Sequence, residues 1–186
     1  MTRTKREKVV VAMSGGVDSA VAALLLKRQG HIVQGVFMKN WSDPLAAECP
    51  WEQEAKDFHS ICGCIGIPGS VATFEQEYRK KVVDYLISGY RRGITPNPDM
   101  LCNREIKFKV FLKYAQSLRA DYIATGHYAR KIKNNGLFEL HQARDLGKDQ
   151  SYFLALLNQR QLQYTLFPIG RYKKNKVRSI AKKAGI

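Results

Sequence analysis

The stretch Val9–Ser19, which reads VVVAMSGGVDS, constrains the fold more than any other part of the sequence. Three successive valines predict a strand that is buried on both faces, as in a parallel sheet. Two glycines follow, and an Ala/Leu-rich run up to Leu26 then predicts a helix. A strand that turns through glycines into a helix directs several backbone N–H groups and the positive end of the helix at one place. The stretch therefore predicts an α/β fold with a phosphate-binding loop.

The loop itself, Ser14-Gly15-Gly16-Val17-Asp18-Ser19, suits a phosphate chain accompanied by a cation. The glycines allow an anion to approach the backbone closely, and the two serines add hydroxyl donors. Asp18 would repel phosphate unless a cation lies between them, so the loop implies Mg²⁺ with Asp18 as its ligand. The loop has neither the lysine of a Walker A sequence nor the G-x-G-x-x-G spacing. An ordinary strand–helix turn is the alternative.

The segment Ile32–Met38 predicts a second strand, so the chain begins with a βαβ unit. This unit implies an open parallel sheet with helices on both faces, a Rossmann-like architecture. Ligands of such sheets lie at the carboxyl ends of the strands. Met38 ends the second strand, and Gly126 and His127 follow a third strand predicted at 121–125, so all three are candidates for the ligand site. Core packing of Met38 and a structural role for His127 are the alternatives.

Two groups of cysteines invite a chemical interpretation. Cys49, His59, Cys62 and Cys64 could form a zinc set, although H-x-x-C-x-C is an unusual spacing. Cys62 also falls on the apolar face of a helix predicted to begin at Pro50, where a thiol acts as a small hydrophobic group. No apolar run reaches the length of a membrane span, so we expect a cytoplasmic chain without membrane contact, in which cysteines are free thiols.

Cys102 lies in a second informative segment, Thr95–Asn103, which reads TPNPDMLCN. Two prolines predict a rigid, extended backbone, and Asn103 predicts the cap of a helix running from Arg104 to Leu118. Cys102 would then precede a helix N-terminus, where the helix dipole lowers the pKa of a thiol and favours a nucleophilic thiolate. Asp99 is a candidate for proton transfer beside it. A packed structural cysteine is the alternative.

The charge balance indicates a polyanionic partner. The chain of 186 residues carries 31 basic and 16 acidic residues, a formal net charge of +15. Nucleic acid is favoured over a membrane surface because no separate basic amphipathic helix is present. A generally basic composition without a specific partner is the alternative.

Four motifs in this order, Ser14–Ser19, Pro96–Asn103, Gly126–Arg130 and Lys148–Leu154, resemble those of the tRNA-specific 2-thiouridylases. The resemblance runs from Lys8 onward and implies an ATP-pyrophosphatase domain of the adenine-nucleotide α-hydrolase (PP-loop) type. In that family ATP adenylates the C2 oxygen of the wobble uridine of tRNA, and sulfur from a cysteine persulfide replaces it as AMP leaves. A persulfide donor protein is therefore implied as a partner.

The resemblance also implies roles for individual residues. Cys102 matches the first catalytic cysteine, and Asn97, Pro98 and Asp99 match residues that meet the target base. His127 would contact tRNA together with Lys148, Asp149 and Gln150. The residues that would bind ATP are Ala12, Met13, Ser14, Gly15, Gly16, Val17, Asp18, Ser19, Met38 and Gly126.

The resemblance implies that residues 1–186 form the catalytic domain, with residues from about 144 to 186 as a candidate start of a helical tRNA-binding domain. The family has a second cysteine in a segment that would follow Ile186, and further tRNA-binding and β-rich domains. This sequence has no cysteine after Cys102, so we expect a fragment of a longer protein or a truncated product. Two other functions stay open: an ATP pyrophosphatase for a small molecule, and a non-catalytic module that binds ATP or RNA.

Overall fold

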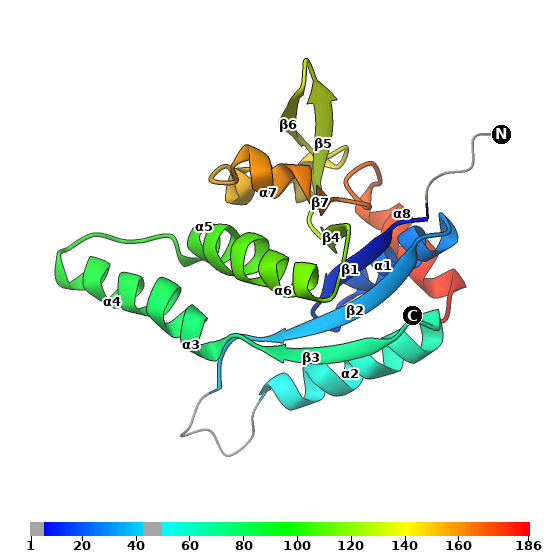
Figure 1. Cartoon of the computed structure of the whole chain (residues 1–186), viewed down its shortest axis with the longest axis horizontal. Helices are drawn as coiled ribbons and strands as arrows, with labels where there is room; N and C mark the ends of the chain where they lie inside the picture. The colour runs from blue at the N-terminus through cyan, green and yellow to red at the C-terminus, as the bar shows by residue number, and fades with distance from the viewer. Residues whose placement is uncertain (1–5, 43–49) are drawn as a thin grey trace.

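A five-stranded parallel sheet forms the centre of the molecule (Figure 1). The computed structural model describes residues 6–42 and 50–186. The strands follow the order β3 (Gly69–Thr73), β2 (Ile32–Lys39), β1 (Lys8–Met13), β4 (Tyr122–Thr125) and β7 (Thr165–Leu166). Each neighbouring pair is parallel, with Val11 of β1 opposite Gly35 of β2 and Ala124 of β4. The three valines of β1 are fully buried, as expected for a central parallel strand.

One face of the sheet is covered by α1 (Val17–Arg28) and α2 (Pro50–Ile65). Phe58 and Cys62 of α2 pack beneath β1 and β2, so Cys62 belongs to the core. Within residues 6–42 and 50–186 no three His, Cys, Asp or Glu side chains gather at a metal-binding distance, so His59, Cys62 and Cys64 do not form a metal site among themselves. Cys49 lies outside the described residues.

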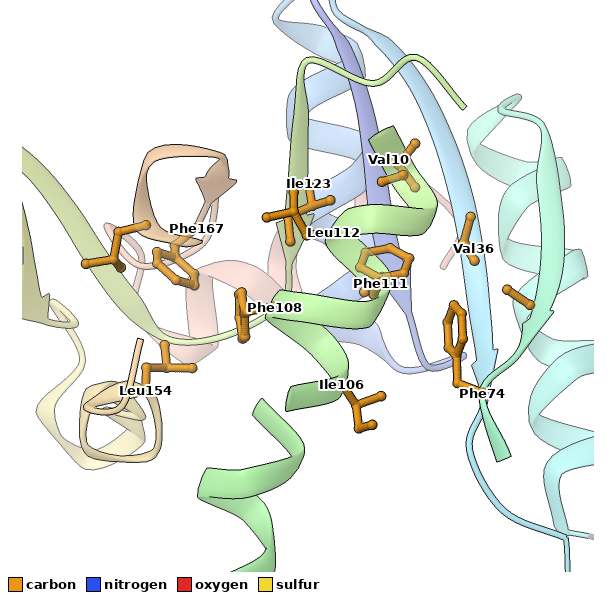
Figure 2. Packing of buried hydrophobic residues seen from close by; sticks show 14 of the residues in the cluster. Val10, Val36, Phe74, Ile106, Phe108, Phe111, Leu112, Ile123, Leu154 and Phe167 are labelled. Carbon is orange, nitrogen blue, oxygen red and sulfur yellow. The ribbon is translucent and has the colours of Figure 1, made fainter. Parts of the chain in front are cut away.

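The opposite face is covered by one long helix with three parts: α5 (Pro98–Leu101), the π-helical segment η2 (Cys102–Val110) and α6 (Phe111–Ser117). Figure 2 shows Phe111 and Leu112 of this helix packed toward Val10 and Ile123 of the sheet. The helix begins at Pro98 rather than at Arg104, so the predicted start was wrong. Asn97 caps it, because its side-chain oxygen accepts from the N–H groups of Asp99 and Met100 at 3.1 and 3.2 Å.

The segment before this helix also forms a continuous helical rod, made of α3 (Glu75–Tyr78), the π-helical turn η1 (Arg79–Val83) and α4 (Asp84–Arg91). A β-hairpin follows β4: β5 (Ala129–Asn134) pairs antiparallel with β6 (Leu137–Gln142) and projects from the main sheet (Figure 1). Its turn residues Asn135 and Gly136 have φ of +47° and +83°, which suits this residue pair.

The last part of the chain returns to the central sheet. It contains the 3₁₀ turns η3 (Leu146–Lys148) and η4 (Ser151–Leu154), then α7 (Gln159–Gln163), β7 and α8 (Lys174–Lys183). Val177 and Ala181 of α8 pack against Val21 and Ala22 of α1, so α1 is enclosed between the sheet and α8. Among the described residues, no helix has the length and apolar character needed to cross a bilayer.

Candidate nucleotide site and its surroundings

A cleft of about 360 Å³ opens at the carboxyl ends of β1, β2 and β4. This is the edge of the sheet at which the sequence places the ligand site. The cleft brings together nine of the predicted residues: Ala12, Met13, Ser14, Asp18, Ser19, Met38, Gly126, His127 and Gln150. Its remaining lining comes from Phe37, Asn40, Glu54, Lys107 and Thr125.

Hydrogen bonds within the loop between β1 and α1 fix its conformation at the edge of the cleft. The hydroxyl oxygen of Ser19 accepts from the N–H of Ser14 at 3.3 Å and donates to the carbonyl of Gly16 at 3.0 Å. Gly15 has φ of +74°, and a Cβ there would lie 2.8 Å from the carbonyl oxygen of Glu54. The first N–H groups of α1 have no intrahelical partner, because of helix geometry, and are therefore available to an anion.

Gly126 brings β4 against the start of α1. A Cβ at this position would lie 2.6 Å from the backbone nitrogen of Ser19 and 2.8 Å from the carbonyl carbon of Asp18. Backbone atoms cannot move aside as a side chain can, so only glycine allows this approach. Gly126 thus packs against the start of α1, a role that the sequence did not predict, while its predicted contact with a nucleotide stays a prediction.

Asp18, in the first turn of α1, is paired with Lys174 of α8. The Nζ atom of Lys174 lies 2.6 and 2.7 Å from the two carboxylate oxygens, and the hydroxyl of Tyr128 donates to Oδ1 at 3.0 Å. Burial and the Asp18 carboxylate together raise the pKa of Tyr128 above its usual value, so its hydroxyl stays a donor.

Two carboxylates line the cleft, Asp18 at the phosphate loop and Glu54 from α2, and this donor set fits a Mg²⁺ that arrives with a triphosphate. Such an ion is held by one or two carboxylates, by the phosphates and by water. It does not fit a resident ion held by protein alone, since no three acidic, His or Cys side chains gather within residues 6–42 and 50–186.

His127 is a neutral group in the cleft. Burial, with a smaller effect from the Lys107 ammonium, lowers its pKa to about 3. Its Nδ1 shares a hydrogen bond of 2.9 Å with the Thr125 hydroxyl, and its ring lies 5.8 Å from that of Phe108. A ligand at this point would therefore meet an uncharged imidazole that can stack or exchange hydrogen bonds, and not a cation.

Cys102 does not line the cleft and does not precede a helix N-terminus. It is the first residue of η2, one turn inside the helix that begins at Pro98, and it is half-buried. Burial raises the pKa of the Cys102 thiol, Lys107 lowers it and Asp99 raises it, with burial the largest effect. The predicted lowering of this pKa by the helix dipole was wrong, because the free N–H groups belong to residues before Cys102.

Lys107 connects the cleft with Cys102. Its side chain lines the cleft beside Gly126 and His127, and its charge acts on both the Cys102 thiol and the His127 imidazole. Lys107 and Cys102 both belong to η2, and π-helical segments are frequent at functional sites. Lys107 is the cationic group of the cleft that sequence analysis missed.

The other predicted site residues lie near the nucleotide cleft or near Cys102. Asn97 lines a separate depression of about 370 Å³, which also takes in Arg104 and Leu156. Gln150 reaches the cleft while its side-chain oxygen accepts from the N–H of Tyr128 at 3.0 Å. Asp149 holds its own turn, because its carboxylate accepts from the N–H of Ala143 and the hydroxyl of Ser151.

A sequence signal exists for only some of the missed residues. Thr125 and Phe37 lie at the ends of predicted strands, so their position at the carboxyl edge was foreseeable. Glu54 and Lys174 come from distant helices, and only the packing of α2 and α8 against α1 brings them to the loop.

Comparison with known proteins gives a consistent assignment. A family model described as "tRNA methyl transferase HUP domain" matches residues 7–186. The chain is 52% identical to a tRNA-specific 2-thiouridylase MnmA of Streptococcus equi subsp. zooepidemicus (strain H70), over all of this chain and 50% of the relative. It is 53% identical, with the same coverage, to the MnmA of Streptococcus pyogenes serotype M1. The chain thus spans about half the length of the curated relatives it matches.

Two solved structures share the fold at low sequence identity. The U34-tRNA thiolase NcsA from Methanococcus maripaludis aligns with a TM-score of 0.60 and 18% identity, over 95% of this chain and 55% of that one. A 4-thiouridine synthetase in a complex with RNA and bound ATP aligns with a TM-score of 0.59 and 18% identity, over 96% and 41%. The expected parallel α/β architecture is confirmed. By its match to the family model over residues 7–186, the chain belongs to the family described as tRNA methyl transferase HUP domain.

Proposed function

We propose that this chain is the ATP-dependent catalytic part of a cytoplasmic tRNA 2-thiouridylase. The observation that carries the proposal is the cleft at the carboxyl edge of the sheet, together with identity of 52–53% to 2-thiouridylases across the whole chain. Residues 1–186 form the catalytic domain in this proposal, and the segment from about 144 onward also begins the tRNA-binding part.

The cleft supports the ATP half of the reaction. The loop Ser14–Ser19 would hold the triphosphate, and Asp18 would be a protein ligand of a Mg²⁺ ion that offsets the charge of the phosphates. Met38 and Gly126 border the space for the nucleoside. The C2 oxygen of the target uridine attacks the α-phosphate, so an O–P bond forms and pyrophosphate leaves. Uridine then carries AMP on a carbon–oxygen bond that can break.

Cys102 supports the sulfur half. In this proposal, a donor protein loads a persulfide on a second cysteine, supplied from outside residues 1–186. The Cys102 thiolate attacks the inner sulfur of that persulfide, so a disulfide forms and hydrosulfide leaves. Hydrosulfide attacks C2 of the adenylated uridine, and AMP leaves with the oxygen. Asp99 serves as the nearby acid–base group, and Lys107 supplies the charge that favours the thiolate.

The binding of tRNA is supported by the charge of the chain and by the position of the predicted contacts. A net charge of +15 favours a nucleic acid, and Gln150 and His127 line the nucleotide cleft. Asn97, Pro98 and Asp99 lie at the start of the helix that carries Cys102, where the target base would have to arrive. Lys148 is exposed on the neighbouring turn.

Pyrophosphate exchange into ATP tests the adenylation step and separates the three candidate functions. We expect exchange that requires tRNA with an unmodified wobble uridine, survives Cys102→Ser and is lost in Gly126→Ala, where a Cβ strikes the backbone of α1. Gly63→Ala is the matched control, since a Cβ there meets no atom within 4 Å. Exchange without tRNA would indicate a small-molecule substrate. Nucleotide binding with no exchange would indicate a binding module.

Mass spectrometry of tRNA nucleosides tests the sulfur step. With a persulfide-loaded donor protein as the only source of sulfur, we expect no repeated formation of 2-thiouridine by residues 1–186 alone, because residues 103–186 offer no second cysteine to carry the persulfide. In a full-length relative that carries this sequence, Cys102→Ser should abolish the product and Cys64→Ser should not. Multiple turnovers that survive Cys102→Ser would contradict the role of Cys102.

A further inference from the structure

An acidic side chain at the mouth of a phosphate site needs a counter-charge. Asp18 lies in the first turn of α1 and lines the cleft, so its carboxylate faces the space in which a triphosphate would be held. Like charges at this range repel strongly wherever water is partly excluded. The Asp18 side chain is 33% exposed, so solvent screens only part of that repulsion.

Lys174 supplies that counter-charge from the far end of the chain. Its Nζ atom contacts both oxygens of Asp18, at 2.6 and 2.7 Å, and its side chain is 20% exposed. The backbone N–H of Lys174 donates to the Asp145 carboxylate at 2.8 Å, which fixes the start of α8. The ammonium also lies 5.8 Å from the ring of Tyr128, whose hydroxyl donates to Asp18. Two separate segments thus converge on one carboxylate.

We propose that Lys174 is a positioning residue of the nucleotide site, which neutralises and orients Asp18 so that the loop accepts a triphosphate. The proposal rests on the proposed function, since it takes ATP as the ligand of the cleft. Without Mg²⁺, the ammonium cancels the charge that would repel the phosphates. With Mg²⁺, the metal provides a second positive charge at the same carboxylate, so the dependence on Lys174 decreases.

The test is calorimetric titration of ATP into three forms of the chain, each with EDTA and with saturating Mg²⁺. In EDTA, Lys174→Met should weaken ATP binding about tenfold, equivalent to about 1.4 kcal/mol. In Mg²⁺, the loss should shrink to about threefold or less. Lys176→Met is the matched control: Lys176 lies on the exposed side of the same helix and should show wild-type binding in both conditions.

The Asp18→Asn background isolates the path through Asp18. Once the carboxylate is gone, Lys174→Met should change ATP affinity in EDTA by about twofold or less. An undiminished tenfold loss there would overturn the proposal and show that the ammonium acts on the nucleotide directly. Equal affinities of wild type and Lys174→Met in EDTA would overturn it as well. Lys174→Arg, which keeps the charge, and urea unfolding of every variant exclude loss of folding as the cause.

The same titration distinguishes a cleft that does not bind ATP from a Lys174 that plays no part in binding. If wild type binds no ATP under either condition, the proposed function fails at its first step. If wild type binds ATP and the Lys174 variants match the Lys176 control, only the role of Lys174 fails.

Discussion

At the scale of single residues, the site is shaped by burial as much as by charge. His127 and Cys102 both carry titratable groups, and burial moves each of them toward its neutral form. The charge of Lys107 acts on both groups, because it favours the Cys102 thiolate and opposes a His127 imidazolium. With these two groups neutral, the charged groups of the cleft region are Lys107, Glu54 and the ion pair of Asp18 with Lys174.

The lowered pKa of His127 makes stability depend on pH in a predictable direction. Its pKa is about 3 in the folded chain and about 6.5 in an unfolded one. Below pH 6.5 the unfolded chain therefore binds more protons, so the stabilisation is complete above pH 6.5 and is lost as pH falls toward 3. We expect the free energy of unfolding to fall by about 1 kcal/mol per pH unit between pH 6 and 4 through this group.

Urea unfolding at a series of pH values measures this slope. His127→Gln removes the titrating group and should flatten the slope relative to wild type. His59→Gln, on the exposed side of α2, is the control and should leave the slope unchanged. Identical slopes for wild type and His127→Gln would show that the imidazole titrates normally and is not desolvated in the folded chain.

The thiols should rank by burial and not by closeness to a helix end. Burial raises the pKa of Cys102 and raises that of Cys62 to about 11, whereas Cys64 is exposed. In a Cys49→Ser background at pH 7.5, alkylation by iodoacetamide should be fastest at Cys64, slower at Cys102 and slowest at Cys62. Lys107→Gln should slow Cys102 further, because the ammonium favours its thiolate. Fastest reaction at Cys102 would restore the low-pKa thiol that the sequence suggests.

At the scale of elements, the helix Pro98–Ser117 decides where the chemistry of Cys102 takes place. It carries Asn97 at its cap, Cys102 one turn later and Lys107 on the side that faces the cleft. The π-helical segment η2 forms its hydrogen bonds over five residues rather than four, so Lys107 follows Cys102 by about one turn of this helix.

The Asn97 cap of this helix should contribute measurably to the free energy of unfolding. Asn97→Ala removes an acceptor of two backbone N–H groups and should lower the free energy of unfolding by about 1 kcal/mol. Asn97→Asp keeps the acceptor and should recover most of that loss. Thermal or urea unfolding of both variants makes the comparison. Equal losses in the two variants would mean that Asn97 acts through something other than its cap.

Some elements could be predicted from the sequence, and others could not. Strand β1 and the glycine loop were predictable, because three valines and two glycines leave few conformations open. The helix start was misplaced because Asn97-Pro98 was interpreted as extended backbone, although a polar cap followed by proline at the first helical position is a start signal. The π-helical winding and the ion pair of Asp18 had no local signal, because they depend on packing against the sheet and on α8.

At the scale of the whole molecule, the nucleotide site joins both ends of the chain. The loop near the N-terminus is backed by α2 on one side and by Lys174 of α8 on the other. The enclosed helix α1 contacts the sheet and α8 at once, so a change in α8 reaches the loop directly. We therefore expect nucleotide binding to stabilise the entire fold and not a local segment.

The central claim is that the cleft at the carboxyl edge of β1, β2 and β4 holds ATP by its phosphates. Calorimetric titration of α,β-methylene-ATP, AMP and adenosine into the chain with Mg²⁺ tests it most directly. Because the loop offers backbone N–H groups to a phosphate chain, the triphosphate analogue should bind about tenfold tighter than AMP, and adenosine weakest of all. Equal affinities for the three ligands, or no binding of the triphosphate analogue, would contradict the account.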